Sequence, residues 1–136
     1  MKFRYKKFGP FLRPVIPVKL TYENRSVWYE VLVDSGADLC IFDAEIGEVL
    51  GLVVEDGEPQ RVSGVAGQTS TYYVHKVVME VGGHPRKIKA GFLPNVAGAC
   101  NYGIVGQNGF FDQFKVTFDF QKEEIELREC LSVEST

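Results

Sequence analysis

The stretch Val31-Leu32-Val33-Asp34-Ser35-Gly36-Ala37-Asp38 decides the fold, because an apolar run leads directly into an acidic glycine turn. Its first three residues are apolar, which predicts a strand that is buried on both faces. Gly36 lets the backbone bend sharply where a side chain would clash. We therefore expect Asp34 at the end of this strand, inside the protein. A carboxylate is poorly solvated there, and this cost indicates that the group has a chemical role.

Length and composition limit the class of protein. A chain of 136 residues is large enough for one core and too small for two, so we expect a single domain over 1–136, with terminal extensions at 1–14 and 129–136. A net charge of -3 gives no reason to expect nucleic acid as a partner. Cys40, Cys100 and Cys130 form no close pairs, which favours a reducing compartment over a disulfide framework or a cysteine zinc site.

The first residues alternate basic and aromatic side chains between Lys2 and Arg13. This pattern fits a membrane-surface or nucleic-acid-binding arm, but a half-buried terminal strand explains it better. No apolar stretch approaches the length of a membrane span, and Pro10, Pro14 and Pro17 break the start, so it is no signal peptide. We expect a cytoplasmic protein without a membrane partner.

A second pattern late in the chain repeats the apolar run into glycine. It is Tyr102-Gly103-Ile104-Val105-Gly106-Gln107-Asn108, and Phe110-Phe111-Asp112-Gln113-Phe114 follows it. The stretch 34–38 resembles the active-site signature of retropepsin-like aspartic proteases, and 102–108 resembles their second signature, which a short helix follows. A plain Asp-Ser-Gly surface turn, the alternative for the first stretch, leaves the second unexplained. The resemblance covers about residues 15–128.

The remaining pattern predicts many short strands and few helices. Asp43 as an N-cap, Glu45 in the first turn and Gly51 as a left-handed stop predict one or two helical turns, with Ile46, Val49 and Leu50 on one face. We expect extended segments at 15–22, 27–33, 39–42, 53–57, 60–74, 74–81, 86–92, 115–120 and 124–128. This spacing predicts an all-β, closed barrel with one or two short helices, as the resemblance implies.

Peptide hydrolysis by carboxylates needs one ionised and one protonated group. Two aspartates within about 3 Å share one proton and divide these roles. Because this chain has one such loop, we expect a homodimer in which Asp34 faces its symmetry mate. The resemblance implies that Ser35 bonds across the dimer axis and that Gly36 presents its backbone to the substrate, with Ala37 and Asp38 lining the adjoining wall. For Asp38, a structural role is an equal alternative.

The substrate is expected to be a peptide or protein that binds as an added strand. Ser63-Gly64-Val65-Ala66-Gly67 resembles the mobile flap tip of the family loosely, and an ordinary glycine hairpin is the alternative. The substrate-binding candidates are Leu32, Ala37, Asp38, Ile41, Gly64, Val65, Ala66, Gly67, Tyr102 and Ile104, of which any apolar member could instead belong to the core.

No cofactor or metal is expected. His75 and His84 have no adjoining carboxylate cluster and fit surface strand positions. Cys40 lies close to Asp34 in sequence, but without a neighbouring histidine it fits a buried small apolar residue better than a nucleophile.

Gln107 is a departure from the resemblance, because retroviral members usually carry there an arginine that pairs with the aspartate matching Asp38. A Gln107 amide hydrogen bond or solvent exposure of Asp38 would compensate. The lost pair supports an alternative function, a catalytically weak or inactive peptide-binding or dimerisation domain. The intact Asp34-Ser35-Gly36 favours an aspartic endopeptidase instead.

Overall fold

A computed structural model describes residues 1–63, 67, 69–94 and 102–130 of the chain. Its elements, in chain order, are β1 (Lys2–Arg4), β2 (Lys6–Phe8), β3 (Phe11–Arg13), β4 (Val15–Tyr22), β5 (Arg25–Val33), β6 (Cys40–Asp43), α1 (Ala44–Val49), the 3-10 turn η1 (Val54–Asp56), β7 (Glu58–Ser63), β8 (Thr69–Val81), β9 (His84–Leu93), β10 (Gly103–Val105), β11 (Phe114–Asp119) and β12 (Glu124–Glu129). Strands therefore dominate the described part of the chain, as the sequence predicts.

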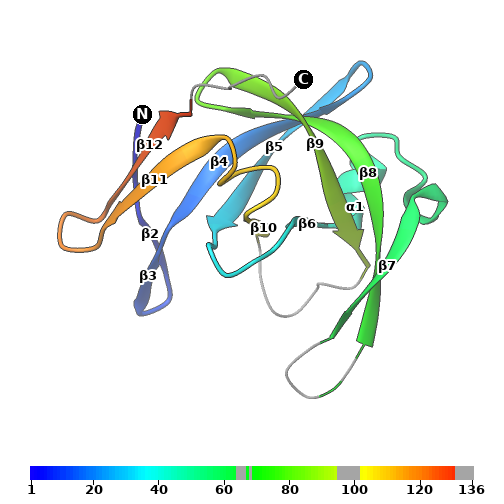
Figure 1. Ribbon diagram of the computed structural model, residues 1–136, viewed down its shortest axis with the longest axis horizontal. Coiled ribbons are helices and arrows are strands. Elements are labelled where there is room, and N and C mark those ends of the chain that lie inside the picture. The colour runs from blue at the N-terminus through cyan, green and yellow to red at the C-terminus, as the bar shows by residue number, and fades with distance from the viewer. Residues whose placement is uncertain (64–66, 68, 95–101, 131–136) are drawn as a thin grey trace.

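The main sheet has the strand order β4-β5-β10-β6-β9-β8-β7, and β4 also pairs with β8. This last pairing closes the sheet into a barrel, around which Figure 1 shows the strands curving. The late strand β10 lies parallel to β5 and antiparallel to β6, so it separates two strands that are neighbours in the chain. This insertion brings the two glycine-containing stretches of the sequence together.

The barrel interior is filled by aromatic and branched aliphatic side chains. Val31 and Val33 of β5 are buried together with Val105 of β10, whereas Leu32 is half-buried, so the predicted burial of this run is complete on one face only. The largest fully buried side chains include Phe42, Phe92, Phe110, Phe114, Ile16, Leu20, Leu50 and Met79. Burial of this set is the main force that holds the barrel together.

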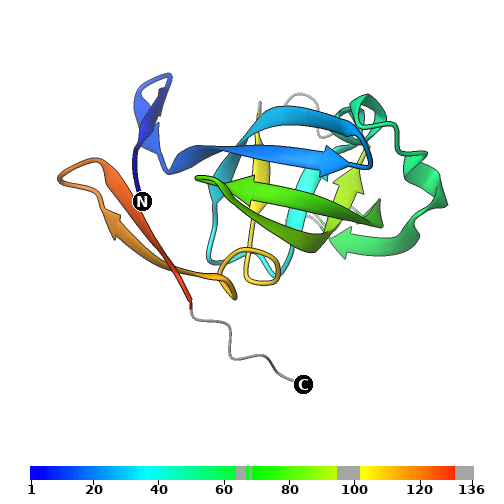
Figure 2. The ribbon, with the colours of Figure 1, turned by 90° about the horizontal axis from the view of Figure 1, so that it is seen from above.

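Three short strands replace the single terminal strand that the alternating start predicts. β1 pairs with β12 in a three-stranded sheet of order β1-β12-β11, which lies beside the barrel in Figures 1 and 2. β2 and β3 pair with each other in a hairpin. The half-burial predicted for this segment holds at Phe3, which packs against the core between exposed neighbours.

The helix begins and ends as predicted, and on its predicted apolar face Leu50 is buried and Ile46 packs against the core, so the prediction fails only at Val49. Asp43 accepts a hydrogen bond from Glu45 N at 2.9 Å, and Gly51 has φ 89°. Ala44 and Gly47 are buried, whereas Val49 is 56% exposed, so its predicted place on the apolar face is wrong. Gly47 packs closely, since a Cβ there would lie 2.9 Å from Phe92 Cδ1.

Two further local predictions are wrong. Residues 53–57, expected to be extended, contain η1, because the Asp56 and Gly57 amides donate back to Val53 and Val54. The short helix expected after Gly106 is a series of turns over 109–113. Its backbone hydrogen bonds join residues at different separations in the chain, from Gln113 N to Phe110 O and from Phe111 N to Gly106 O. The regular hydrogen-bond pattern of a helix therefore does not form.

In the described ranges, no helix is both long and apolar enough to cross a membrane.

Candidate active site

Residues 34–39 form a loop between β5 and β6, which we call the acidic loop. The Asp34 amide donates to Val105 O at 3.0 Å, which continues the pairing of β5 with β10 by one residue. Gly36 N donates to Asp34 Oδ1 at 2.9 Å and so orients the carboxylate. Asp34 is half-buried in this chain, which corrects the expectation that it lies inside the protein.

The segment 106–108 holds the acidic loop through main-chain and side-chain bonds. Gln107 N donates to Ala37 O at 2.8 Å, and Asn108 donates to Asp38 O through its amide N at 3.0 Å and its Nδ2 at 2.9 Å. Gln107 Nε2 donates to Ser35 O at 3.0 Å, while Asp38 is exposed. Both compensations expected for the missing arginine are therefore present.

Gly106 is required by a close approach of two backbones. A Cβ at this position would lie 2.4 Å from Ala37 O and 2.6 Å from Leu39 O. These distances are below any real contact, so a side chain at 106 would push the acidic loop away from β10. The glycine of the second pattern thus allows the backbone of the acidic loop to pack against β10.

A groove of about 380 Å³ lies beside the acidic loop. It is lined by Gly36, Ala37, Asp38, Leu39, Ile41, Arg61, Val62, Tyr72 and Ile104. Its walls come from different parts of the chain, since the loop forms one side and β7 with β8 forms the other. A mainly apolar groove next to a half-buried carboxylate is suited to holding part of a peptide.

Comparison with known proteins decides the family. The sequence profile of the family described as "Aspartyl protease" matches residues 18–108, which include both glycine patterns. The chain belongs to the aspartyl protease family. No curated protein gives a significant sequence match.

Two solved structures are similar to this aspartyl protease chain. A retropepsin-like aspartic protease from Rickettsia conorii is 15% identical, with a TM-score of 0.64, over 92% of this chain and 97% of that one. The EIAV protease, solved with an inhibitor, is 21% identical, with a TM-score of 0.49, over 75% of this chain and 88% of its own. The first similarity establishes the retropepsin-like fold that the sequence predicts.

Some of the residues that the sequence predicts to contact the substrate lie at the groove. Gly36, Ala37, Asp38, Ile41 and Ile104 all line it. Ser35 is exposed at the tip of the acidic loop, where its carbonyl accepts the Gln107 bond.

Other predicted contacts lie elsewhere. Leu32 is half-buried on β5 opposite Ile104, outside the lining of the groove. Tyr102 is 6% exposed, accepts a hydrogen bond from Arg13 at 2.6 Å and packs edge-on against Phe8. Gly67 has φ 77°, and 64–66 lie outside the described residues. For these positions, a substrate contact stays a prediction.

Four lining residues were missed by sequence reasoning: Leu39, Arg61, Val62 and Tyr72. Tyr72 reaches the groove because Gly91 leaves room for it, since a Cβ at 91 would lie 2.5 Å from the Tyr72 ring and 2.8 Å from Ile41 Cδ1. The isolated Gly91 within a strand pattern was the signal for this close approach.

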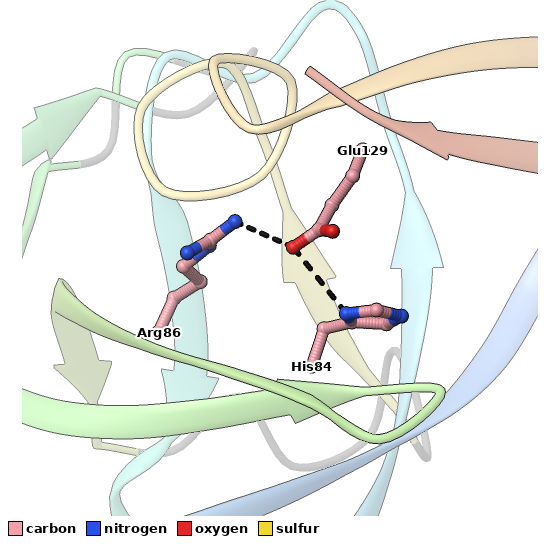
Figure 3. A network of polar contacts seen from close by, with 3 residues as sticks. All are labelled: His84, Arg86 and Glu129. Carbon is pink, nitrogen blue, oxygen red and sulfur yellow. Dashed lines mark hydrogen bonds and ion pairs between the residues drawn. The ribbon is translucent and has the colours of Figure 1, made fainter. Parts of the chain in front are cut away.

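The side chains weighed as alternative chemical groups have structural partners. Burial raises the pKa of the Cys40 thiol to about 11, with a smaller contribution from the negative charge of Asp112, so the thiol is protonated at neutral pH. A ring nitrogen of His75 lies 2.7 Å from Val54 O. His84 lies 3.3 Å from Glu129, which also binds Arg86 at 2.5 Å (Figure 3). Within the part of the chain that the structure describes, no group of His, Cys, Asp and Glu side chains could hold a metal ion.

Proposed function

We propose that this chain is an aspartic endopeptidase that hydrolyses peptide bonds as a homodimer. The observation that carries the proposal is the position of Asp34 at the end of β5, with one carboxylate oxygen bonded to Gly36 N and a groove for a peptide beside it. The family match over 18–108 supports the reaction class.

In the proposed dimer, the two Asp34 carboxylates share one proton because like charges at short distance cannot both ionise. The ionised carboxylate takes a proton from a water molecule, and the protonated one donates to the carbonyl oxygen of the scissile bond. Water then adds to the carbonyl carbon. Collapse of the tetrahedral species releases the amine, which receives a proton from the pair.

The hydrogen bonds from 105–108 to the acidic loop hold Asp34 in position for this mechanism. They fix the loop backbone at Asp34, Ala37 and Asp38, so the carboxylate direction does not need to be set when the substrate binds. The exposed groove face of Asp38 and Gly36 is proposed to bind the extended substrate backbone.

The experiment compares cleavage of a denatured protein by the wild type, Asp34→Asn and Asp56→Asn at pH 4 to 7. Asp56→Asn is the matched control, since it removes the same charge from an exposed residue of η1. We expect Asp34→Asn to lose about 10³-fold or more in kcat/KM and the control to lose nothing. Equal cleavage by all three proteins would exclude the mechanism. Peptide binding without cleavage by the wild type would favour the inactive binding domain.

A mixing experiment tests the shared site. If each dimer needs two Asp34 carboxylates, an equimolar mixture with Asp34→Asn keeps about a quarter of the activity of the same total amount of wild type after subunit exchange. Half the activity would mean that each subunit works alone, and a monomer in sedimentation at every concentration would agree with that result.

A further inference from the structure

The floor of the groove is an aliphatic surface that runs across neighbouring strands. Ile104 of β10 lies opposite Ile41 of β6, and Ile41 lies opposite Gly91 of β9. Ile41 and Ile104 are half-buried and line the groove, whereas the residues on either side of each are buried, so this row lies on the outer face of the barrel. Because neighbouring strands are about 4.8 Å apart, the row spans about 10 Å from β10 to β9.

Tyr72 of β8 closes the β9 end of this row. Its ring lies directly over Gly91, because a Cβ at 91 would be 2.5 Å from its Cδ2 and 3.0 Å from its Cε2. Tyr72 is only 8% exposed and lines the groove, while the next residue, Tyr73, packs against the core. The Tyr72 side chain is therefore a fixed wall at the far end of the aliphatic floor.

The hydroxyl group of Tyr72 has no hydrogen-bond partner among the residues that the structure describes. Gln60, which lies opposite Tyr72 in the β7–β8 pairing, donates its amide to Glu58 instead, at 3.2 Å. The hydroxyl is not fully buried either, since the fully buried polar atoms without a partner in the described side chains belong to Glu30 and Gln113. It is therefore available to a molecule in the groove.

The charged residues of the lining lie away from this end of the floor. Gln60 and Tyr72 share one face of the β7–β8 pair, so the intervening Arg61 points to the opposite face. Asp38 belongs to the acidic loop, on the other wall of the groove. The polar group that a side chain meets after crossing Ile104 and Ile41 is thus the neutral Tyr72 hydroxyl.

We infer that Tyr72 determines specificity by selecting peptides with a tyrosine side chain in this groove. The inference rests on the proposed function, because it concerns the substrate of the same site. The ring of the substrate tyrosine covers Ile104 and Ile41, and its hydroxyl forms a hydrogen bond with the Tyr72 hydroxyl, in which one group donates and the other accepts.

Other side chains fit this arrangement less well. A phenylalanine fills the same space but forms no bond with the Tyr72 hydroxyl. A glutamine brings a carbonyl and two N–H donors to an aliphatic floor, where a single hydroxyl cannot satisfy all of them. A charged side chain would lose hydration without meeting an opposite charge at the β9 end.

The test uses peptides made from one cleaved sequence, in which each residue flanking the cut is replaced in turn by Tyr, Phe or Gln. The readout is the ratio of kcat/KM for the Tyr and Phe peptides, which differ by one hydroxyl group. At the position that fills the groove, we expect a ratio of about 5 for the wild type and of about 1 for Tyr72→Phe. A Gln peptide that the wild type cuts faster than the Tyr peptide at this position would contradict the choice of tyrosine.

Tyr73→Phe is the matched control, because it removes the same hydroxyl group from the neighbouring residue, which lies outside the groove lining. Its ratio should equal that of the wild type. The inference is overturned if the wild type cuts peptides but Tyr72→Phe leaves the ratio unchanged at every position, or if Tyr73→Phe changes it equally. An equal loss of kcat/KM for the Tyr and Phe peptides in Tyr72→Phe would also overturn it, since the hydroxyl would then bind the peptide main chain.

Binding of the same peptides, measured by fluorescence anisotropy, separates this inference from the proposed function. If the wild type cuts no peptide, the proposed function fails, and the Tyr-to-Phe ratio of Kd values in wild type and Tyr72→Phe still decides the role of Tyr72. If neither the cleavage ratio nor the binding ratio responds to Tyr72→Phe, the role assigned to Tyr72 is wrong, whatever the activity. A wild type that binds none of the peptides overturns both proposals.

Discussion

The two walls of the groove are built in different ways. The acidic loop is bonded to 105–108 along most of its length and lies against Gly106 with no room for a side chain. The opposite wall includes β7, which has every residue exposed and, in the described sheet, pairs along one edge with β8 alone. Figure 1 shows β7 and β8 extending away from the barrel. The acidic loop proposed for chemistry is thus rigidly held, while the β7 residues that line the groove can adjust.

The largest effect is expected from Gly106→Ala, which would break the rigid side of this comparison. The added methyl group meets the Ala37 and Leu39 carbonyls, so we expect a loss of about 3 kcal/mol in the free energy of unfolding and no measurable cleavage. Urea unfolding and a cleavage assay measure both. Gly83→Ala is the control: it meets no atom within 4 Å, and its φ of 87° should cost only about 1 kcal/mol without affecting cleavage.

Thiol labelling compares the two walls directly. In a protein with Cys100 and Cys130 changed to Ser, Cys40 reports the loop side, and a second variant carries Val62→Cys with Cys40→Ala. Burial raises the Cys40 pKa from its usual 9.0 to about 11, so its thiolate fraction near pH 8 is about 100-fold lower than that of an exposed thiol. We expect labelling at 62 to be at least that much faster. Similar rates would show that the loop side opens as readily as β7.

The same raised pKa predicts a pH dependence of stability. Folding favours the neutral Cys40 thiol, so its contribution is complete below pH 9 and is lost as the pH rises through about 11. The fall in urea midpoint over this range should be smaller in Cys40→Ala. An identical fall in both proteins would assign it to other groups.

Gln107→Ala should have a smaller effect, because it removes one hydrogen bond to Ser35 O from a loop that keeps its main-chain bonds. We expect a loss of about 1 kcal/mol in unfolding free energy and a fall of several-fold in kcat with little change in KM. A change in KM alone would place Gln107 in substrate binding rather than in positioning the loop.

The smallest effect is expected from Val62→Ala on the β7 wall. Val62 is 40% exposed, so its truncation should leave unfolding within about 0.5 kcal/mol of the wild type and raise KM about threefold through lost apolar contact. Val53→Ala, at a residue that is 62% exposed and outside the groove, should change neither quantity. A large loss of stability in Val62→Ala would show that β7 is not the weakly held wall.

Sequence patterns predicted the elements that are determined by interactions between residues close together in the chain. The β4 bounds, the Asp43 cap and the Gly51 stop follow from alternation, side-chain capping and backbone freedom at neighbouring residues. The helix face was predicted correctly at Ile46 and Leu50 but not at Val49, which is exposed because the contact of Gly47 with Phe92 sets how the helix lies on the barrel. That contact joins distant segments and leaves no local pattern.

The candidate site shows the same limit. Asp34 and Ile104 were found because they lie inside glycine patterns, whereas Arg61 and Tyr72 were missed because a hairpin carries them to the groove. Their place depends on how β8 pairs with β4 and β9, which no single segment specifies. Residues outside a motif reach the site through topology.

The insertion of β10 between β5 and β6 has a consequence for the order of events during synthesis. The bond from Asn108 to Asp38 joins residues 70 positions apart, so the acidic loop cannot be assembled until the ribosome has released nearly the whole barrel sequence. Such distant pairings are slow to form. A nascent chain therefore lacks the bonds that hold the acidic loop until β10 has emerged.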